Sequence, residues 1–211
     1  MKNKSIYLSA IFLIIAMSSC KKDETAEVVI VDNTDTLHSV YTLETSKGDI
    51  SIYLYKDVAL HYSNFDSLAK AGFYDGVIFH RVIDNFMIQG GDPTGTGSGG
   101  PGYTIPAEIK SKYKHKHGAV STARQGNAVN PERRSSGSQF FIVENKNGYP
   151  SLDGEYTVFG ETLKGLDVVS AIAVVAKNAR DKPDVDVVIN KITIKTYTEE
   201  GLMDDFGFSV P

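Results

Sequence analysis

The chain has 211 residues, a formal net charge of −4, 19 glycines, one cysteine and no tryptophan. A chain of this length is expected to form one domain, or one domain with tails, and it can bury a sizeable core. The mild acidity argues against a nucleic-acid partner, which needs a basic face, and the many glycines are typical of a β-rich protein with many turns.

Residues 1–19 have the pattern of an export signal rather than of folded structure. Lys2 and Lys4 form a positive start, and the apolar run 6–16 is shorter than the roughly 20 residues that span a bilayer. Cys20, the only cysteine, follows directly. The sequence therefore predicts a signal peptide over residues 1–19.

The segment 17–20 resembles a bacterial lipobox, in which the cysteine is lipidated and becomes the mature N-terminus. It departs from that pattern at Met17, where leucine is usual. A buried free thiol is the alternative explanation of a lone cysteine, but Cys20 lies at the end of a signal segment. We expect a lipid-anchored protein of the bacterial cell envelope, on the periplasmic face or the cell surface. Residues 20–36 are predicted to form the lipidated N-terminus and a flexible tether, although the run 28–31 could add an edge strand.

Residues 37–197 carry alternating apolar segments and turn residues and are predicted to form the folded domain. The segments of strand length are 40–43, 50–55, 77–79, 86–88, 103–109, 118–122, 140–143, 157–159 and 187–195. Two amphipathic helices are predicted over residues 62–71 and 166–173. Many strands with few helices indicate an antiparallel β protein. The acidic tail 198–211 has no predicted role.

The stretch 73–102 organises the rest of the chain. Its apolar runs flank Arg81 and precede Gln89, and a glycine-rich loop follows. An arginine among aromatic and aliphatic neighbours has two interpretations. It can bury its stem and keep its charged head in water, or its guanidinium can be held at the rim of an apolar pocket to donate hydrogen bonds to a bound carbonyl.

Three segments in this order, 79–102, 136–142 and 152–160, resemble the signatures of the cyclophilins, the cyclosporin-binding class of peptidyl-prolyl isomerases. The resemblance covers residues 39–195. It implies a mainly β fold, a closed eight-stranded antiparallel β-barrel capped by two α-helices, with a filled interior and a binding groove on its outer face. It also implies a monomeric peptidyl-prolyl cis-trans isomerase that acts on proline-containing polypeptides and assists the folding of exported or envelope proteins.

Isomerisation needs no nucleophile, no metal and no cofactor, because the barrier of about 18–20 kcal/mol comes from the partial double bond of the amide. By the resemblance, Arg81 is the catalytic donor that stabilises the twisted amide, and Gln89 orients Arg81 and binds the substrate carbonyl. The implied substrate-binding residues are Phe86, Met87, Phe141 and Leu152 around the proline, Ala123, Arg124 and Gln139 on the groove floor, and Tyr156, where many members have histidine. Core packing is the alternative for Phe86, Met87 and Phe141.

Two departures from the family pattern stand out. Ser151 occupies a position where the best-known members carry a tryptophan that contacts cyclosporin, which puts drug binding in doubt. The loop 125–134 is longer and more charged than usual. It brings Arg124, Arg133 and Arg134 near the groove, where they either select acidic residues beside the proline or are simply solvated.

Two further motifs admit other chemistries. The glycines of 95–100 fit G-x-G-x-x-G, but no helix follows to bind a phosphate, so a turn-rich rim loop is expected. The H-x-H of 115–117 has no third ligand at a recognisable spacing, so a solvated basic segment is expected rather than a metal site.

A proline-binding chaperone or interaction module with little turnover is the alternative function, and it comes from a different class of protein. The presence of Arg81, Phe86 and Gln89 favours the enzyme. A purely structural lipoprotein would leave the three signature segments unexplained.

Overall fold

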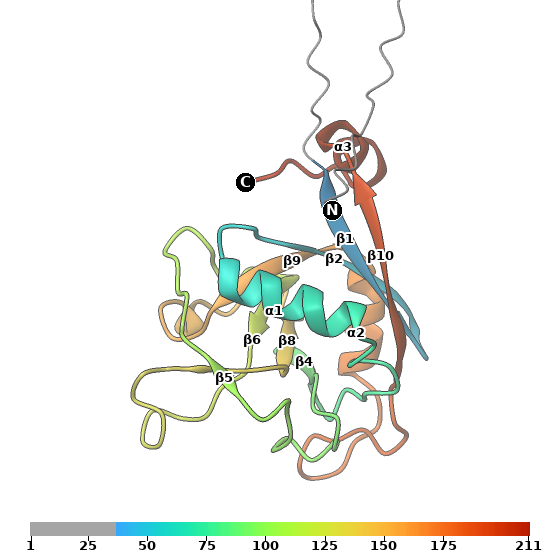
Figure 1. The fold of residues 1–211 in the computed structure, drawn as a ribbon. Coiled ribbons are helices and arrows are strands. Elements are labelled where there is room, and N and C mark those ends of the chain that lie inside the picture. Colours follow the sequence, from blue (N-terminus) through green and yellow to red (C-terminus); the bar gives the residue numbers. More distant parts are fainter. Residues whose placement is uncertain (1–36) are drawn as a thin grey trace, which may run out of the picture. The chain divides into compact units, whose positions relative to one another are not determined.

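The computed structural model describes residues 37–211, so the predicted signal peptide, the lipidation site and the tether lie outside the described residues. The described part contains an eight-stranded sheet, a two-stranded sheet and three α-helices (Figure 1). Within it, no helix combines the length and the apolar character needed to cross a membrane.

The large sheet has the strand order β10-β1-β2-β9-β6-β8-β4-β3, and each pair of neighbours is antiparallel. Its strands are β1 (His38–Thr45), β2 (Gly48–Leu54), β3 (Arg81–Ile83), β4 (Met87–Gly90), β6 (Ala119–Thr122), β8 (Phe140–Val143), β9 (Val158–Lys164) and β10 (Ile189–Tyr197). The small sheet pairs β5 (Thr104–Ile105) with β7 (Ser135–Ser136). The predicted strand 103–109 is therefore reduced to two residues.

The expectation of a closed barrel is wrong, because β10 and β3 lie at the two edges of the sheet and do not pair. The segment 77–79, which was predicted as a strand, spans the gap between the edges with single bridges only. Ile78 bridges Asp92 on one side and Val188 on the other. One bridging residue cannot form the continuous ladder that closes a barrel. The result is a curled sheet, an open half-barrel.

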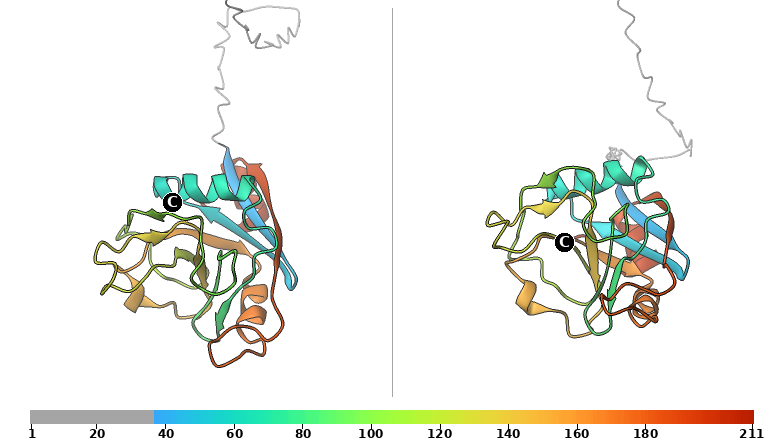
Figure 2. Two further views of the ribbon diagram at one scale, coloured as in Figure 1. Left: turned by 60° about the horizontal axis from the view of Figure 1, so that its bottom comes forward. Right: turned by 90° about the horizontal axis from the view of Figure 1, so that it is seen from below.

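The two predicted helices are present, and they lie on opposite sides of the curled sheet (Figure 2). They are α1 (Ala59–Lys70) and α2 (Leu166–Ala173), and α2 has the predicted bounds. Helix α1 buries Phe65, whose ring contacts Tyr74 at 4.9 Å and Phe140 at 5.7 Å between centroids. Such aromatic pairs contribute about 0.5–1.5 kcal/mol each beyond their buried area. This aromatic cluster fixes α1 against the sheet.

A third helix, α3 (Glu199–Phe206), forms in the acidic segment for which no role was predicted. Thr198 caps it by accepting a hydrogen bond from the Gly201 N–H at 3.1 Å, and Gly207 ends it in the left-handed conformation at φ 62°. Leu202, a residue of α3, is fully buried. Within residues 37–211, the two predicted capping helices are therefore corrected to three helices, and the last of these packs on the end of β10.

Candidate active site

An open cavity of about 430 Å³ lies beside β3, β4 and β8. Nine of the ten residues that the sequence predicted for the site line it: Arg81, Phe86, Met87, Gln89, Ala123, Arg124, Phe141, Leu152 and Tyr156. The tenth, Gln139, is buried behind them. These residues come from strands, loops and the short 3₁₀ helix η1 (Pro150–Leu152), so only the folded chain brings them together.

The strand register explains why the polar and apolar groups meet. Arg81 on β3 is paired with Gln89 on β4, and Gln89 is paired with Phe141 on β8. Residues that lie opposite one another on neighbouring strands point to the same face of a sheet. Arg81, Gln89 and Phe141 therefore form one row across three strands. Met87 precedes Gln89 by two positions and shares its face.

Arg81 lies at the rim of the cavity, and its side chain is 42% exposed. Its guanidinium carbon is 5.9 Å from the centroid of the Phe86 ring, and its Nε is 3.7 Å from Oδ2 of Asp181. Asp181 is also tied to β3, because its backbone oxygen accepts a hydrogen bond from the Val82 N–H at 2.8 Å. No sequence motif indicates Asp181, which is a hundred positions away from Arg81 along the chain.

Gln89 and Gln139 form a hydrogen-bonded pair beside Arg81. Nε2 of Gln89 donates to Oε1 of Gln139 at 3.0 Å, and Nε2 of Gln139 donates to the backbone oxygens of Gly97 at 3.1 Å and Gly99 at 2.8 Å. These partners fix the orientation of both amides. Gln139 thus connects the site to the glycine-rich loop instead of lining the cavity.

The glycine-rich loop folds around the carboxylate of Asp92, which is fully buried. The backbone N–H groups of Thr94, Thr96, Gly97 and Gly99 donate to this carboxylate at 2.6–3.1 Å. Burial acts to raise the pKa of Asp92, but the hydrogen bonds outweigh it and hold the pKa well below its usual range. The loop therefore surrounds an internal anion.

The arginines near the groove are paired rather than free. Arg124 has a side chain that is 4% exposed, its Nη2 is 3.1 Å from Oε2 of Glu155, and its guanidinium lies 4.5 Å from the ring centroid of Tyr156. Arg133 contacts Oε1 of the same Glu155 at 3.0 Å. Arg134 donates to Oγ1 of Thr104 at 2.8 Å. Glu155 therefore holds the loop 125–134 against the wall that carries Tyr156.

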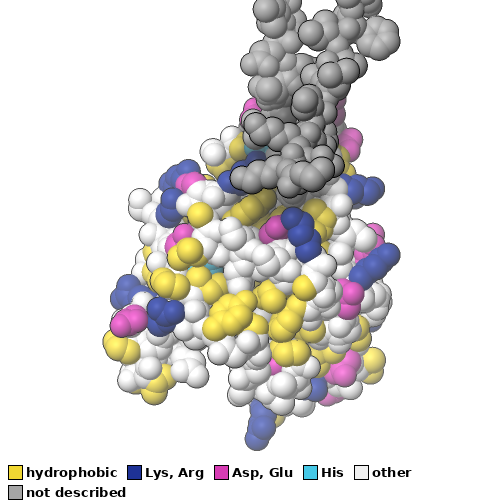
Figure 3. All heavy atoms as spheres, viewed as in Figure 1, with side chains coloured by type: hydrophobic (Ala, Val, Ile, Leu, Met, Phe, Trp, Pro, Cys, Tyr) yellow, Lys and Arg dark blue, Asp and Glu magenta, His cyan; other side chains and the backbone are white. Residues whose placement is uncertain are grey.

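The H-x-H segment differs from the expectation of a solvated basic segment. Just before this segment, Nζ of Lys110 and Nζ of Lys112 lie 3.2 and 3.1 Å from Oδ2 of Asp57. Basic and acidic side chains are interspersed on the face of the molecule seen in Figure 3. His115, in contrast, is 2% exposed and lies behind Phe141. The solvated interpretation is wrong for His115 because an acceptor 38 positions away, Asp153, allows its ring to be buried.

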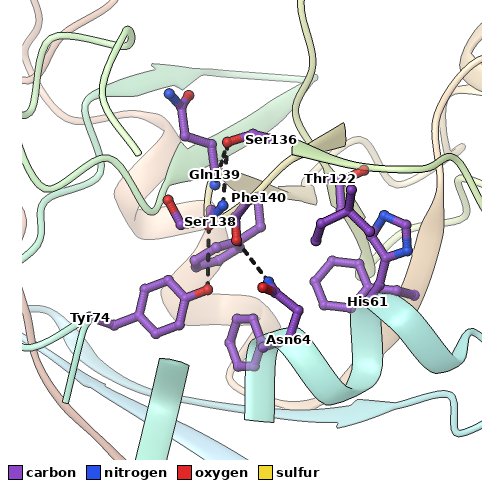
Figure 4. Close-up of a pocket in the computed structure, with 12 residues that line it drawn as sticks. His61, Asn64, Tyr74, Thr122, Ser136, Ser138, Gln139 and Phe140 are labelled. Carbon is purple, nitrogen blue, oxygen red and sulfur yellow. Dashed lines mark hydrogen bonds between the residues drawn. The ribbon is translucent and has the colours of Figure 1, made fainter. Parts of the chain in front are cut away.

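A second, smaller pocket of about 220 Å³ lies between α1 and the segment 136–140 (Figure 4). His61 lies at its edge, with Nδ1 2.6 Å from Oε2 of Glu108 and Nε2 2.9 Å from Oγ of Ser135. This order of groups resembles a hydrolytic triad, but Ser135 is 1% exposed and a substrate cannot reach it. In residues 37–211, moreover, no three His, Cys, Asp or Glu side chains come together as a metal site.

The fold and the larger cavity define a class of protein. It has a curled antiparallel sheet, and the outer face of this sheet carries a pocket of mainly apolar residues that is bordered by an arginine and an ordered glutamine amide. The comparison with known families gives this class its name. The family described as "Cyclophilin type peptidyl-prolyl cis-trans isomerase/CLD" matches residues 40–194. The chain belongs to the cyclophilin-type peptidyl-prolyl cis-trans isomerase family, as the sequence motifs predicted.

Individual relatives agree with this assignment. A peptidyl-prolyl cis-trans isomerase of Helicobacter pylori is 47% identical over 135 residues, which cover 62% of this chain and 78% of that protein. A peptidyl-prolyl cis-trans isomerase of Arabidopsis thaliana is 40% identical over 158 residues, and the match covers 94% of that protein. A crystal structure of a Cryptosporidium parvum cyclophilin-type isomerase in the presence of the dipeptide Ala-Pro has a TM-score of 0.68 and 32% identity, with 75% of this chain and 99% of that chain covered.

Proposed function

We propose that this isomerase acts on X–Pro bonds of exported or envelope polypeptides, with the proline ring in the apolar cavity and Arg81 as the catalytic donor. The activity follows from the family. The role of Arg81 is supported by the row that it forms with Gln89 and Phe141 at the edge of the cavity. A relative that was crystallised with Ala-Pro supports a proline-containing substrate.

The proposed chemistry is rotation without covalent change. Twisting an X–Pro amide localises the lone pair on the proline nitrogen, and a cationic donor that is held near this nitrogen stabilises the twisted state. Arg81 carries that charge, while Phe86, Met87, Phe141 and Leu152 supply the apolar surface that holds the ring. In this proposal Gln89, whose amide donates to Gln139, binds the substrate carbonyl. Each ~1.4 kcal/mol gained only in the twisted state raises the rate tenfold.

The test of this mechanism is the pair of variants Arg81→Ala and Arg81→Lys. Loss of one preorganised donor is expected to lower kcat/KM about 10²–10³-fold in Arg81→Ala. Arg81→Lys keeps the charge without the planar fork and should recover only part of the activity. Exchange NMR on a short Ala-Pro peptide measures turnover, and thermal unfolding checks the fold. A folded Arg81→Ala protein within about threefold of wild type, well under 1 kcal/mol, would favour the chaperone interpretation.

We also propose that the protein is a monomer anchored to the cell envelope by lipid on Cys20. The support is the sequence alone, namely the signal-like residues 1–19 followed by the only cysteine. Cys20→Ser is expected to release the protein into the soluble periplasmic fraction or to leave the signal uncleaved. Fractionation and the mass of the mature protein measure this outcome. Unchanged membrane partitioning together with an unchanged mature mass would contradict lipidation.

A further inference from the structure

His115 lies directly behind the apolar wall of the cavity. Its ring is nearly parallel to that of Phe141, at 11° with centroids 6.0 Å apart, and it meets the ring of Tyr156 at 85° and 6.4 Å. Phe141 and Tyr156 contact each other edge to face at 6.0 Å. The three rings form one packed unit, of which Phe141 and Tyr156 line the cavity.

The polar groups of His115 are all engaged. Nδ1 is 2.9 Å from Oδ1 of Asp153, and the backbone N–H of His115 donates to the same oxygen at 2.9 Å. Nε2 is 3.1 Å from Oγ of Ser121, and the backbone oxygen accepts from the Tyr149 N–H at 2.7 Å. Because a carboxylate accepts but does not donate hydrogen bonds, Nδ1 carries the proton in the contact with Asp153.

These hydrogen bonds connect His115 to the remaining apolar walls. Asp153 directly follows Leu152, which lines the cavity. Tyr149 packs on Phe86 with ring centroids 4.4 Å apart. His115 therefore contacts two walls through its ring and reaches the other two through its hydrogen-bond partners. Being 2% exposed, it does not itself reach a substrate.

We propose that His115 is a positioning residue of the isomerase site. Its ring and its hydrogen bonds hold Phe141, Tyr156 and the turn 149–153 at the spacing that grips a proline ring. A site that is fixed before binding has less ordering to do when the substrate arrives, and this raises affinity. The inference rests on the proposed function, because it assumes that the cavity holds the proline.

The chain contains a matched control in His61. This residue is also 2% exposed, its Nδ1 and its backbone N–H both meet Oε2 of Glu108, at 2.6 and 3.0 Å, and its Nε2 meets Ser135. The arrangement repeats that of His115, but His61 belongs to the second pocket near α1 (Figure 4). Replacing either histidine should lower stability, whereas only His115 should affect the proline site.

The experiment compares His115→Asn, His115→Phe and His61→Asn with the wild type. The asparagine keeps an amide for Asp153 and loses the ring, whereas the phenylalanine keeps a ring and loses both side-chain hydrogen bonds. We expect each His115 variant to raise the Kd for a short Ala-Pro peptide about three- to tenfold, since stacking and one hydrogen bond are of that size. We expect kcat to fall by a smaller factor than the factor by which the Kd rises, because Arg81 is unchanged. His61→Asn should change the Kd less than about twofold.

The outcomes separate this inference from the proposed function. If both His115 variants alter the Kd no more than His61→Asn does, His115 does not position the site. If Arg81→Ala retains its kcat, the proposed mechanism fails whatever His115 does. If the His115 variants do not fold, an NMR titration of the wild-type protein tests the proposal instead. Addition of the Ala-Pro peptide should shift the ring signals of His115 and leave those of His61 unchanged. Unshifted His115 signals would overturn the proposal.

Discussion

At the scale of single residues, Asp181 is the acid that faces the guanidinium of Arg81. Its backbone has φ 62°, a left-handed conformation that asparagine and glycine adopt readily and most other residues avoid. The turn around it is fixed by Asn178, whose Oδ1 accepts from the Arg180 and Lys182 N–H groups at 2.8 and 3.2 Å. A carboxylate held in this way limits the positions of the arginine that it faces.

We expect Asp181→Asn to lower kcat/KM about twofold to fivefold. The pair is partly exposed, and such pairs contribute only about 0.2–1 kcal/mol. Asparagine keeps the shape and the backbone preference, so the melting temperature should hardly change. Combining Asp181→Asn with Arg81→Ala is the control, because a residue that acts through Arg81 has no further effect once Arg81 is gone. Additive losses in the double variant would show that Asp181 acts independently of Arg81.

Residues inside the three motif segments could be predicted from the sequence, and the cavity lining contains nine of the ten predicted residues. Asp181 and His115 could not be predicted in these roles. Each depends on a partner far along the chain, Arg81 in one case and Asp153 in the other. Local patterns of apolar and polar residues carry no information on such distant pairs.

At the scale of elements, short-range patterns predicted α2 with its full bounds and placed strands within β1 and β2. The same patterns placed a strand at 77–79, whereas the ladder begins at Arg81. Closure of the sheet depends on the register between its two edges, which only the folded chain sets. Helix α3 has local signals at both ends, a capping Thr198 and a terminal Gly207, although the sequence analysis predicts no helix there.

The loop 125–134 is held by Glu155, and this makes the charge preference of the groove testable. Glu155→Ala removes the acid that neutralises Arg124 and Arg133. In Glu155→Ala, we expect kcat/KM for a glutamate-containing X–Pro peptide to rise relative to that for a lysine-containing X–Pro peptide. This preference should increase about twofold to fivefold over the wild type, because one uncompensated surface charge contributes up to about 1 kcal/mol. An unchanged ratio, measured by exchange NMR on both peptides, would show that these arginines do not select the substrate.

At the scale of the whole molecule, the buried ionisable groups make the folded state sensitive to acid. Burial lowers the pKa of four histidines, His38, His61, His80 and His115, against the opposing effect of nearby acids. For the carboxyls of Glu108 and Asp153, burial acts to raise the pKa, but hydrogen bonds from His61 and His115 outweigh it and lower the pKa. Both kinds of group hold fewer protons in the folded chain than in the unfolded chain.

The sign of the pH dependence follows from this difference. Where the unfolded chain binds more protons, the free energy of unfolding falls as the pH falls. The histidines should contribute their full stabilisation above their unfolded pKa of 6.5 and lose it as the pH falls below that value. The stabilisation from the carboxyls of Glu108 and Asp153 should be lost as the pH falls below their unfolded pKa values of 4.5 and 3.8. We therefore expect the melting temperature to decrease from pH 7.5 to 5 and again below about pH 4.5. Thermal unfolding at several pH values measures this, and His61→Asn should weaken the first decrease. A melting temperature that stays level or rises between pH 7.5 and 5 would show that the buried histidines are not neutral in the folded protein.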